Sequence, residues 1–185
     1  MALITSAEVK VLLSIPTATT TWDTLIANMI VIINEWLPNY LNNYFTDPNL
    51  YIESANISFT GTTILDSESS FVTEGFVTGM DIYVFGSLHN DGFHLITTAS
   101  AGTLTCTGSA FITEAAGDST PRINRVKYPV SLKPSIANII KFQIDQEKQG
   151  LGTERIGDYT VGYGDGYNFP KSIVKTLGIY KKVGF

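Results

Sequence analysis

Ser172 and Lys175 have the spacing of a serine nucleophile and its lysine base. In the motif S-x-x-K, a lysine one helical turn from a serine can take the hydroxyl proton and so activate the oxygen. No S-D-N sequence follows, however, and Lys175-Thr176 leads into Leu177 rather than into the glycine of K-T-G. A four-residue match without these companions favours an ordinary solvated helix face over a hydrolase site.

His89 and His94 are the two histidines of the chain and, together with Asp91, could ligate a metal ion. They bracket an Asn-Asp-Gly sequence that is typical of a turn with positive φ. Five-residue spacing across a hairpin places the two side chains on opposite sides of the strand pleat, and no fourth ligand suggests itself. The pattern favours hairpin packing, and we predict no metal site, no cofactor and no catalytic site.

The segment from Gly157 to Pro170, GDYTVGYGDGYNFP, could cradle a phosphate, because glycine lets backbone amides approach an anion closely. A P-loop needs G-x-x-x-x-G-K-[ST], and a dinucleotide site needs G-x-G-x-x-G between a strand and a helix. The glycines here alternate with single residues and match neither motif. The spacing predicts an extended contact segment over residues 157–163, then a turn over residues 164–168.

The composition indicates a globular chain of 185 residues, long enough for one ordinary domain or two small ones. Its single cysteine, Cys106, excludes an internal disulfide framework and is typical of a reducing compartment. No basic region precedes the first apolar residues, and the longest apolar run stops far short of a membrane span. We therefore expect neither a signal peptide nor a membrane anchor.

Charge is divided unevenly along the chain. Residues 1–121 hold Lys10 as their only base against twelve acids, whereas residues 122–185 hold eleven bases and five acids. This asymmetry predicts that the basic part meets an acidic protein surface or phosphate, and that the acidic part stays clear of nucleic acid. Two solvated faces without such partners are the alternative.

Helical periodicity predicts four helices, which lie towards the two ends of the sequence. Thr5 and Glu8 form a capping box before a short helix over residues 6–14. The strongest pattern covers residues 22–44, with a kink or break at Pro38. A third helix follows Ser131 and ends near Gly150, and a last one begins at Pro170 and continues to about residue 180.

The stretch between these helices has the texture of strands. Threonine, serine, glycine and β-branched residues alternate there between turn signals. We place strands near residues 57–59, 80–85, 93–97, 103–107 and 123–126. The fold class predicted is therefore α+β: a small helical host domain of about four helices, residues 1–53 and 128–185, interrupted by an inserted antiparallel β-barrel or sandwich module, residues 54–127.

Two features favour an assembly role over catalysis. The mean hydropathy of +0.13 is high for a small monomer, and several aromatic residues follow the long helical pattern. The chain end, GIYKKVGF, places two lysines before an apolar tip. It is either a docking segment or a tail packed on its own domain.

Four stretches of the sequence together resemble a known family. They are the capped segment ITSAEVKVLL, the long helix ending in NNYF, the run ERIGDYTVGY, and the final FPKSIVKTLGIYKKVGF. They look like the head-to-tail connector, or adaptor, proteins of tailed bacteriophages. Most specific is the run from Glu154 to Val161, which is similar to a recurring IGDYSVSY segment of that family. The resemblance covers about residues 1–50 and 130–185, whereas the β-module is similar to small β-domains of other phage structural proteins.

The resemblance implies a virion structural protein of the neck, assembled in the host cytoplasm. Its members form a homo-oligomeric ring of about 12 subunits, and a closed ring needs two different contact faces on each subunit. One side of the ring binds the portal protein and the other a stopper or tail-completion protein, while genomic DNA passes through without sequence-specific binding. Portal contact would be made by Tyr159, Tyr163, Tyr167, Tyr180, Lys181, Lys182 and Phe185.

Two other functions stay open at this stage. A virion or tail protein that binds a ligand, glycan or receptor would use an aromatic-lined groove on the β-module, and residues 54–127 alone should then bind that ligand. A small hydrolase would lose its activity on Ser172→Ala or His94→Ala substitution.

Overall fold

The computed structural model describes residues 3–108, 110–149, 153–156, 159–162 and 174–182. The chain divides into two compact units. We call Tyr44–Tyr128 the β unit, and Leu3–Asn43 together with Pro129–Phe185 the helical unit. Each unit has its own buried apolar residues and is described by itself.

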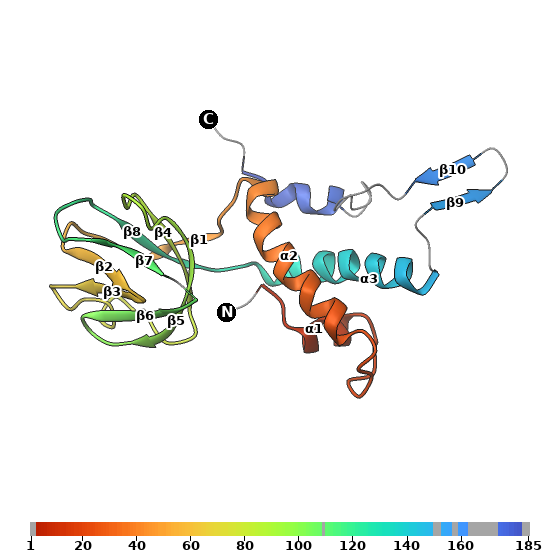
Figure 1. The fold of residues 1–185 in the computed structure, drawn as a ribbon, viewed down its shortest axis with the longest axis horizontal. Helices are drawn as coiled ribbons and strands as arrows, with labels where there is room; N and C mark the ends of the chain where they lie inside the picture. The colour runs from red at the N-terminus through yellow and green to blue at the C-terminus, as the bar shows by residue number, and fades with distance from the viewer. Residues whose placement is uncertain (1–2, 109, 150–152, 157–158, 163–173, 183–185) are drawn as a thin grey trace. The chain divides into compact units, whose positions relative to one another are not determined.

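The β unit is an eight-stranded antiparallel sheet (Figure 1). Its strands are β1 (Thr46–Glu53), β2 (Ile57–Gly61), β3 (Thr63–Asp66), β4 (Asp81–Phe85), β5 (Gly92–Ala99), β6 (Thr103–Thr107), β7 (Phe111–Glu114) and β8 (Arg122–Val126). The order across the sheet is β1-β8-β4-β5-β6-β3-β2-β7. The first and last strands in sequence, β1 and β8, are therefore neighbours.

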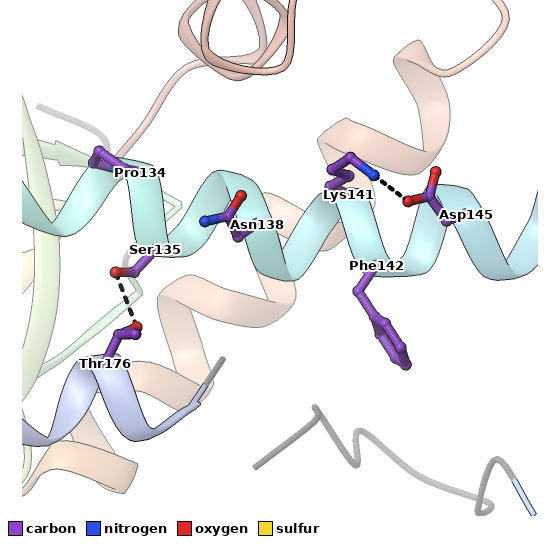
Figure 2. A pocket seen from close by; sticks show the side chains of 7 residues that line it. All are labelled: Pro134, Ser135, Asn138, Lys141, Phe142, Asp145 and Thr176. Carbon is purple, nitrogen blue, oxygen red and sulfur yellow. Dashed lines mark hydrogen bonds and ion pairs between the residues drawn. The ribbon is translucent and has the colours of Figure 1, made fainter. Parts of the chain in front are cut away.

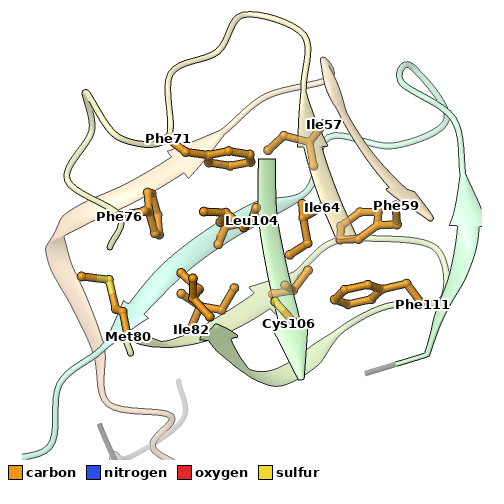
Figure 3. Close-up of a cluster of buried hydrophobic side chains, with 13 residues drawn as sticks. Ile57, Phe59, Ile64, Phe71, Phe76, Met80, Ile82, Leu104, Cys106 and Phe111 are labelled. Atoms are coloured by element: carbon orange, nitrogen blue, oxygen red, sulfur yellow. The ribbon is translucent and has the colours of Figure 1, made fainter. Parts of the chain in front are cut away.

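Alternation along the strands separates the two faces of the sheet, because directly opposed residues of an antiparallel pair point to the same side. Val84 of β4 is paired with Ile123 of β8, which is paired in turn with Ile52 of β1. Val84 and Ile123 belong to one apolar core, and Ile52 packs against it. Figure 3 shows other members of this core, among them Phe59, Leu104 and Phe111. The core cluster consists of Ile57, Phe59, Ile64, Phe71, Phe76, Met80, Ile82, Val84, Ile96, Leu104, Cys106, Phe111 and Ile123.

The sheet curls far enough to bring β5 and β7 to the same core, although they are not neighbours in the strand order. The ring of His94 on β5 lies 4.8 Å from the ring of Phe111 on β7. The loop between β4 and β5 also reaches β7, where the side chain of Asn90 donates to the carbonyl of Ile112 and accepts from its amide, each at 2.8 Å. Asn90 thus supplies the pairing that a ninth strand would offer to β7.

Glu114, on the same strand, holds this loop from within the core, where its side chain is 3% exposed. Its carboxylate accepts hydrogen bonds from the amides of Leu88 and His89 at 3.0 and 2.8 Å and from the amide group of Asn90 at 2.6 Å. Ser119 adds a hydroxyl at 3.3 Å. A buried carboxylate with this many donors fixes the loop in one conformation.

The helical unit contains α1 (Ser6–Leu12), α2 (Asp23–Leu41) and α3 (Lys133–Gln149). Two 3₁₀ turns, η1 (Val130–Leu132) and η2 (Thr176–Tyr180), and a hairpin of β9 (Thr153–Ile156) and β10 (Tyr159–Gly162) complete its described elements. The three α-helices contact one another, and α2 also contacts η2. Their buried apolar positions include Val9, Ile26, Ile33, Leu37, Ile136, Ile140 and Leu177.

Local chemistry explains where these helices begin and end. The predicted capping box is confirmed, because Thr5 Oγ1 accepts from the amide of Glu8 and the Glu8 carboxylate accepts from the amide of Thr5. The second helix runs through Pro38 and ends at Leu41, because Asn42 adopts the left-handed conformation with φ of 48°. Buried Lys10 closes the loop between the first two helices by pairing with Asp23 at 2.5 Å.

The predicted fold class is wrong. The structure is dominated by the eight-stranded antiparallel sheet, and the described residues contain only three α-helices, not a four-helix host domain with an inserted barrel or sandwich. Residues 46–53, assigned to the helical part, form β1. The last helix was predicted to begin at Pro170. Within the described residues it is one short turn followed by the 3₁₀ segment Thr176–Tyr180. This segment contains Gly178, and glycine disfavours a continuous α-helix.

We expect Glu114→Ala to destabilise the β unit by about 3 kcal/mol, because the substitution removes a buried carboxylate that accepts from the amides of Leu88 and His89 and from the side chain of Asn90. Chemical denaturation followed by far-ultraviolet circular dichroism measures this loss. Both tryptophans, Trp22 and Trp36, belong to the helical unit, so their fluorescence should report an unchanged transition for that unit. Exposed Glu74→Ala is the matched control, and an equal loss in both variants would contradict the role given to Glu114.

Candidate functional site

The three residues considered as metal ligands, His89, Asp91 and His94, lie in the described part of the β unit. Asp91 uses its carboxylate to accept from the amides of Gly86 and Ser87 and from the Ser87 hydroxyl, at 2.7–3.1 Å. His94 is half-buried with its Nε2 atom 3.3 Å from the carbonyl of Asn90, and burial lowers the pKa of its imidazole. Within the described ranges, no group of three His, Cys, Asp or Glu residues is placed to hold a metal ion. The ring of His94 packs beside Phe111, whereas His89 is exposed and is held by its backbone amide on Glu114.

Nucleophilic residues are likewise engaged in structural contacts where the structure describes them. Cys106 is buried in the core, and burial raises the pKa of its thiol to about 11, which keeps the sulfur protonated and unreactive. Ser172 lies outside the described residues, and Lys175 is exposed at the start of η2.

A groove of about 410 Å³ follows α3 beside η2 (Figure 2). It is lined by Pro134, Ser135, Asn138, Lys141, Phe142, Asp145 and Thr176. The hydroxyl of Thr176 donates to that of Ser135 at 3.1 Å, and Lys141 forms an ion pair with Asp145 one turn along the helix. The serine has no neighbouring base among these lining residues, so the arrangement does not activate it for catalysis.

A second groove, of about 360 Å³, is far more apolar and lies between α1 and the start of α3; we call it the α1 groove. It is lined by Ala7, Glu8, Val11, Leu12, Val130, Lys133 and Pro134. Val11 and Val130 are 69% and 78% exposed. A capped surface helix normally turns polar residues outward, whereas α1 buries Val9 and still presents Val11 and Leu12 to solvent. An apolar centre beside charged residues is the anatomy of a protein-binding surface.

One ion pair connects the two walls of the α1 groove. Lys133 Nζ lies 2.5 Å from a carboxylate oxygen of Glu8, so the start of α3 is tied to the first turn of α1. The hydrogen bond from Lys133, and next the backbone hydrogen bond from Thr5, lower the pKa of Glu8. The carboxylate is therefore charged at neutral pH and keeps the groove open to a defined width.

The β unit has an outward surface that is rich in aromatic rings, which we call the aromatic face: Tyr44, Tyr51, Tyr83, Phe85, Phe93 and Leu95. Register places Tyr51, Asn124, Tyr83 and Phe93 in one row across β1, β8, β4 and β5. Tyr44 stacks on Tyr83 with ring centroids 4.4 Å apart, and Phe93 meets Tyr83 edge-on at 4.8 Å. Burial, and next a hydrogen bond with Tyr44, raise the pKa of Tyr83 to about 12, so its phenol stays neutral.

Charged residues border the aromatic face. Asp81 pairs with Leu95 in the row on one side of Tyr83, and Glu53 lies opposite Arg122 in the row on the other side. The guanidinium of Arg122 lies 3.8 Å above the ring of Tyr51 and 3.7 Å from Glu53. The face therefore presents five aromatic rings and a leucine with carboxylates at its margin.

The structure divides the residues predicted for portal contact. Tyr163, Tyr167 and Phe185 lie outside the described residues, and Tyr159 is described only as part of the backbone of β10. Tyr180 donates its hydroxyl to Ser131 at 2.7 Å, and its carbonyl accepts from Asn43 at 2.9 Å. Its polar atoms therefore anchor the tail on its own unit.

Lys181 and Lys182 follow the anchored tyrosine and are exposed. The amide of Lys182 donates to the carbonyl of Leu41 at 3.0 Å, which fixes the backbone while the side chain remains outside. Ile179, which was not among the predicted contact residues, is 81% exposed, and Lys175, four residues before it, is exposed as well. We call Lys175, Ile179, Lys181 and Lys182 the lysine edge.

Sequence reasoning missed the α1 groove and the aromatic face for different reasons. The apolar positions expected to be buried on this helix were Val9, Leu12 and Leu13, and Val11 was not considered, although the adjacent pair Leu12-Leu13 is already wider than a short helix can bury. The alternation of Tyr83 and Phe85, and of Phe93 and Leu95, was the available signal for a two-sided apolar sheet. Register decides which of these residues are neighbours, and the sequence analysis assigned no register.

Comparison with known proteins adds no family. No protein-family model and no curated protein matches the chain. In the part of the chain that the structure describes, none of the helices has the length and apolar character needed to cross a bilayer. The resemblance to phage connectors therefore stays a prediction from the sequence.

We expect the Glu8–Lys133 pair to make the helical unit sensitive to acid. A glutamate whose pKa is lowered by folding stabilises the folded state at pH values above its ordinary pKa of 4.5. That stabilisation is lost as the pH falls through the lower pKa of the folded state. The wild type should therefore be more stable than Glu8→Gln at neutral pH, and the difference should vanish in acid. Urea unfolding at several pH values, followed by tryptophan fluorescence, measures it, with exposed Glu147→Gln as control. A difference that does not change with pH would contradict this assignment.

Proposed function

We propose that the chain is a structural protein of the neck of a tailed bacteriophage, a head-to-tail connector that forms a ring between the portal and a stopper or tail-completion protein. The observation that carries this proposal is the presence of two chemically different exposed apolar surfaces. The α1 groove belongs to the helical unit, and the aromatic face belongs to the β unit. A connector contacts both its neighbouring subunits and a portal outside the ring, so each subunit needs separate exposed surfaces for these two kinds of contact.

The α1 groove is the surface that we assign to a partner outside the ring. The segment ITSAEVKVLL, which resembles the connector family, forms the wall of this groove, including Val11 and Leu12. Since the resemblance implies that the connector binds a portal, the portal is the partner proposed for the groove. Tyr159, Tyr163, Tyr167 and Phe185 remain proposed portal contacts from the resemblance alone.

The tail has a more limited part in this proposal than its sequence predicts. Tyr180 stabilises the attachment of the tail through Ser131 and Asn43. Removal of residues 178–185 would therefore disturb the packing of the tail as well as any contact made by Lys181 and Lys182. Substitution of exposed side chains separates binding from folding more cleanly.

A virion protein that binds a ligand or receptor through its β unit is the second candidate function. The aromatic face favours it, because exposed aromatic rings next to polar groups are typical of recognition surfaces. Titration of the full chain with glycans, followed by the chemical-shift changes of Tyr51 and Phe93 in NMR spectra, would distinguish this function from a connector that binds only other proteins.

We expect electron microscopy of the chain mixed with a portal protein of a tailed phage to show rings with an axial hole attached to the portal. Monomers that persist in the mixture and in the chain alone would contradict the connector function.

Val11→Asp should weaken portal attachment by tenfold or more, a loss of about 1.4 kcal/mol, because a charged carboxylate must be desolvated in the α1 groove. Val31→Asp is the matched control, since Val31 is 58% exposed on α2 and does not line the groove. Surface plasmon resonance on immobilised portal measures the binding. Equal weakening by both substitutions would show that the groove is not the contact.

A further inference from the structure

We infer that the aromatic face of one copy of the chain binds the lysine edge of a second copy. This contact would join neighbouring subunits and thus rests on the proposed ring, in which it supplies the heterologous interface. It gives a purpose to the β unit, which the resemblance to connectors does not cover.

The aromatic face has the exposure and continuity that a docking surface needs. Tyr51, Phe93 and Leu95 are each about 40% exposed, and Phe85 is 60% exposed. The register places these residues in adjacent rows on one side of four hydrogen-bonded strands. The opposite side of the same strands carries Ile82, Val84 and Ile123 into the core, so the outward rings cannot be accommodated by turning inward.

The electrostatics of the β unit favour a basic partner. Residues 44–128 contain nine acids and three bases, and all three bases lie between Arg122 and Lys127. Arg122 is already engaged by Glu53 and by the ring of Tyr51. Nucleic acid would be repelled by such a surface, whereas ammonium groups would be attracted to it.

The lysine edge has the complementary chemistry. Ile179 is 81% exposed on η2, and the exposed residues Lys175, Lys181 and Lys182 lie four residues before it and two and three residues after it in the sequence. The edge is held in place by buried Leu177, by the hydrogen bond from Tyr180 to Ser131, and by the amide of Lys182 on Leu41. A contact made by a pre-ordered segment loses less conformational entropy on binding than one made by a free tail.

These two surfaces fit each other better than either fits itself. An isoleucine between lysines can pack on aromatic rings while its neighbouring ammonium groups lie over tyrosine faces or next to carboxylates. Two aromatic faces would bring Asp81 and Glu53 of both copies together, and two lysine edges would bring lysines together. Unlike surfaces on one chain give a head-to-tail contact, which closes as a ring when the rotation allows.

The test is sedimentation velocity of the full chain over a range of protein concentrations, at low and at high ionic strength. The wild type should self-associate, and more weakly at high salt. Lys181→Glu/Lys182→Glu should raise the dissociation constant about tenfold or more, and so should Glu53→Lys/Phe85→Lys on the aromatic face. An equimolar mixture of these two variants should recover association, because each variant supplies the intact surface that the other lacks, and the exchanged charges complement each other across the second contact.

The control variant, Ile112→Lys/Glu74→Lys, makes equivalent apolar-to-lysine and glutamate-to-lysine changes at exposed positions away from the aromatic face. It should associate like the wild type, and circular dichroism should show that every variant is folded. A wild type that stays monomeric at all concentrations would overturn the proposed contact, and so would a mixture that fails to recover association. If only the aromatic-face variant loses association, the lysine edge is not the occupant and the proposal fails.

The same variants separate this inference from the connector function. Attachment to the portal is measured independently, through the α1 groove. A chain that binds the portal but does not associate through the aromatic face would refute the subunit contact alone. A chain that self-associates as proposed but ignores the portal would refute the connector function alone.

Discussion

The two ends of the β unit are held together, and the rest of the structure depends on this closure. Thr46 of β1 is paired with Val126 of β8, the amide of Lys127 donates to the carbonyl of Phe45 at 2.8 Å, and the rings of Phe45 and Tyr128 meet at 5.2 Å. Burial, and next the charge of Asp81, raise the pKa of Tyr128 to about 12, so no phenolate forms at this junction. Because β1 and β8 are neighbours, the chain enters and leaves the β unit at adjacent points. The β unit can therefore interrupt the helical unit without separating the helices that pack together.

Local signals predicted the elements that have regular patterns and missed those that do not. The Thr5 capping box, the apolar stripe of α2 and the strands β4 and β5 all follow the expected periods of 3.6 and 2. In contrast, β1 contains Pro48 and a register shift before Tyr51, so its alternation is interrupted. The short strand β7 places Glu114 at a buried position, which breaks the polar and apolar alternation by which a strand is recognised.

The candidate surfaces were harder to predict than the helices and strands, because each surface is made by residues that are distant in sequence. Val11 and Val130 become neighbours across the α1 groove only when α1 packs beside the start of α3. Tyr51 and Tyr83 are brought together by two strand registers. Conversely, Tyr180 is of a residue type that is common at binding surfaces, but its hydroxyl donates to Ser131 within the helical unit. Residue type alone therefore overestimated how available Tyr180 is for a partner.

The fold also changes the meaning of the charge division. Along the sequence, acids dominate up to residue 121 and bases afterwards, but the boundary between units lies elsewhere. Counted by unit, the β unit has nine acids and three bases, whereas the helical unit has eight acids and nine bases and is close to neutral. The asymmetry is therefore an excess of negative charge on the β unit, together with a local concentration of lysines at the tail. A uniformly basic half would favour any anion, whereas an acidic unit and a lysine-rich edge on one chain are the complementary charges that the proposed contact between copies requires.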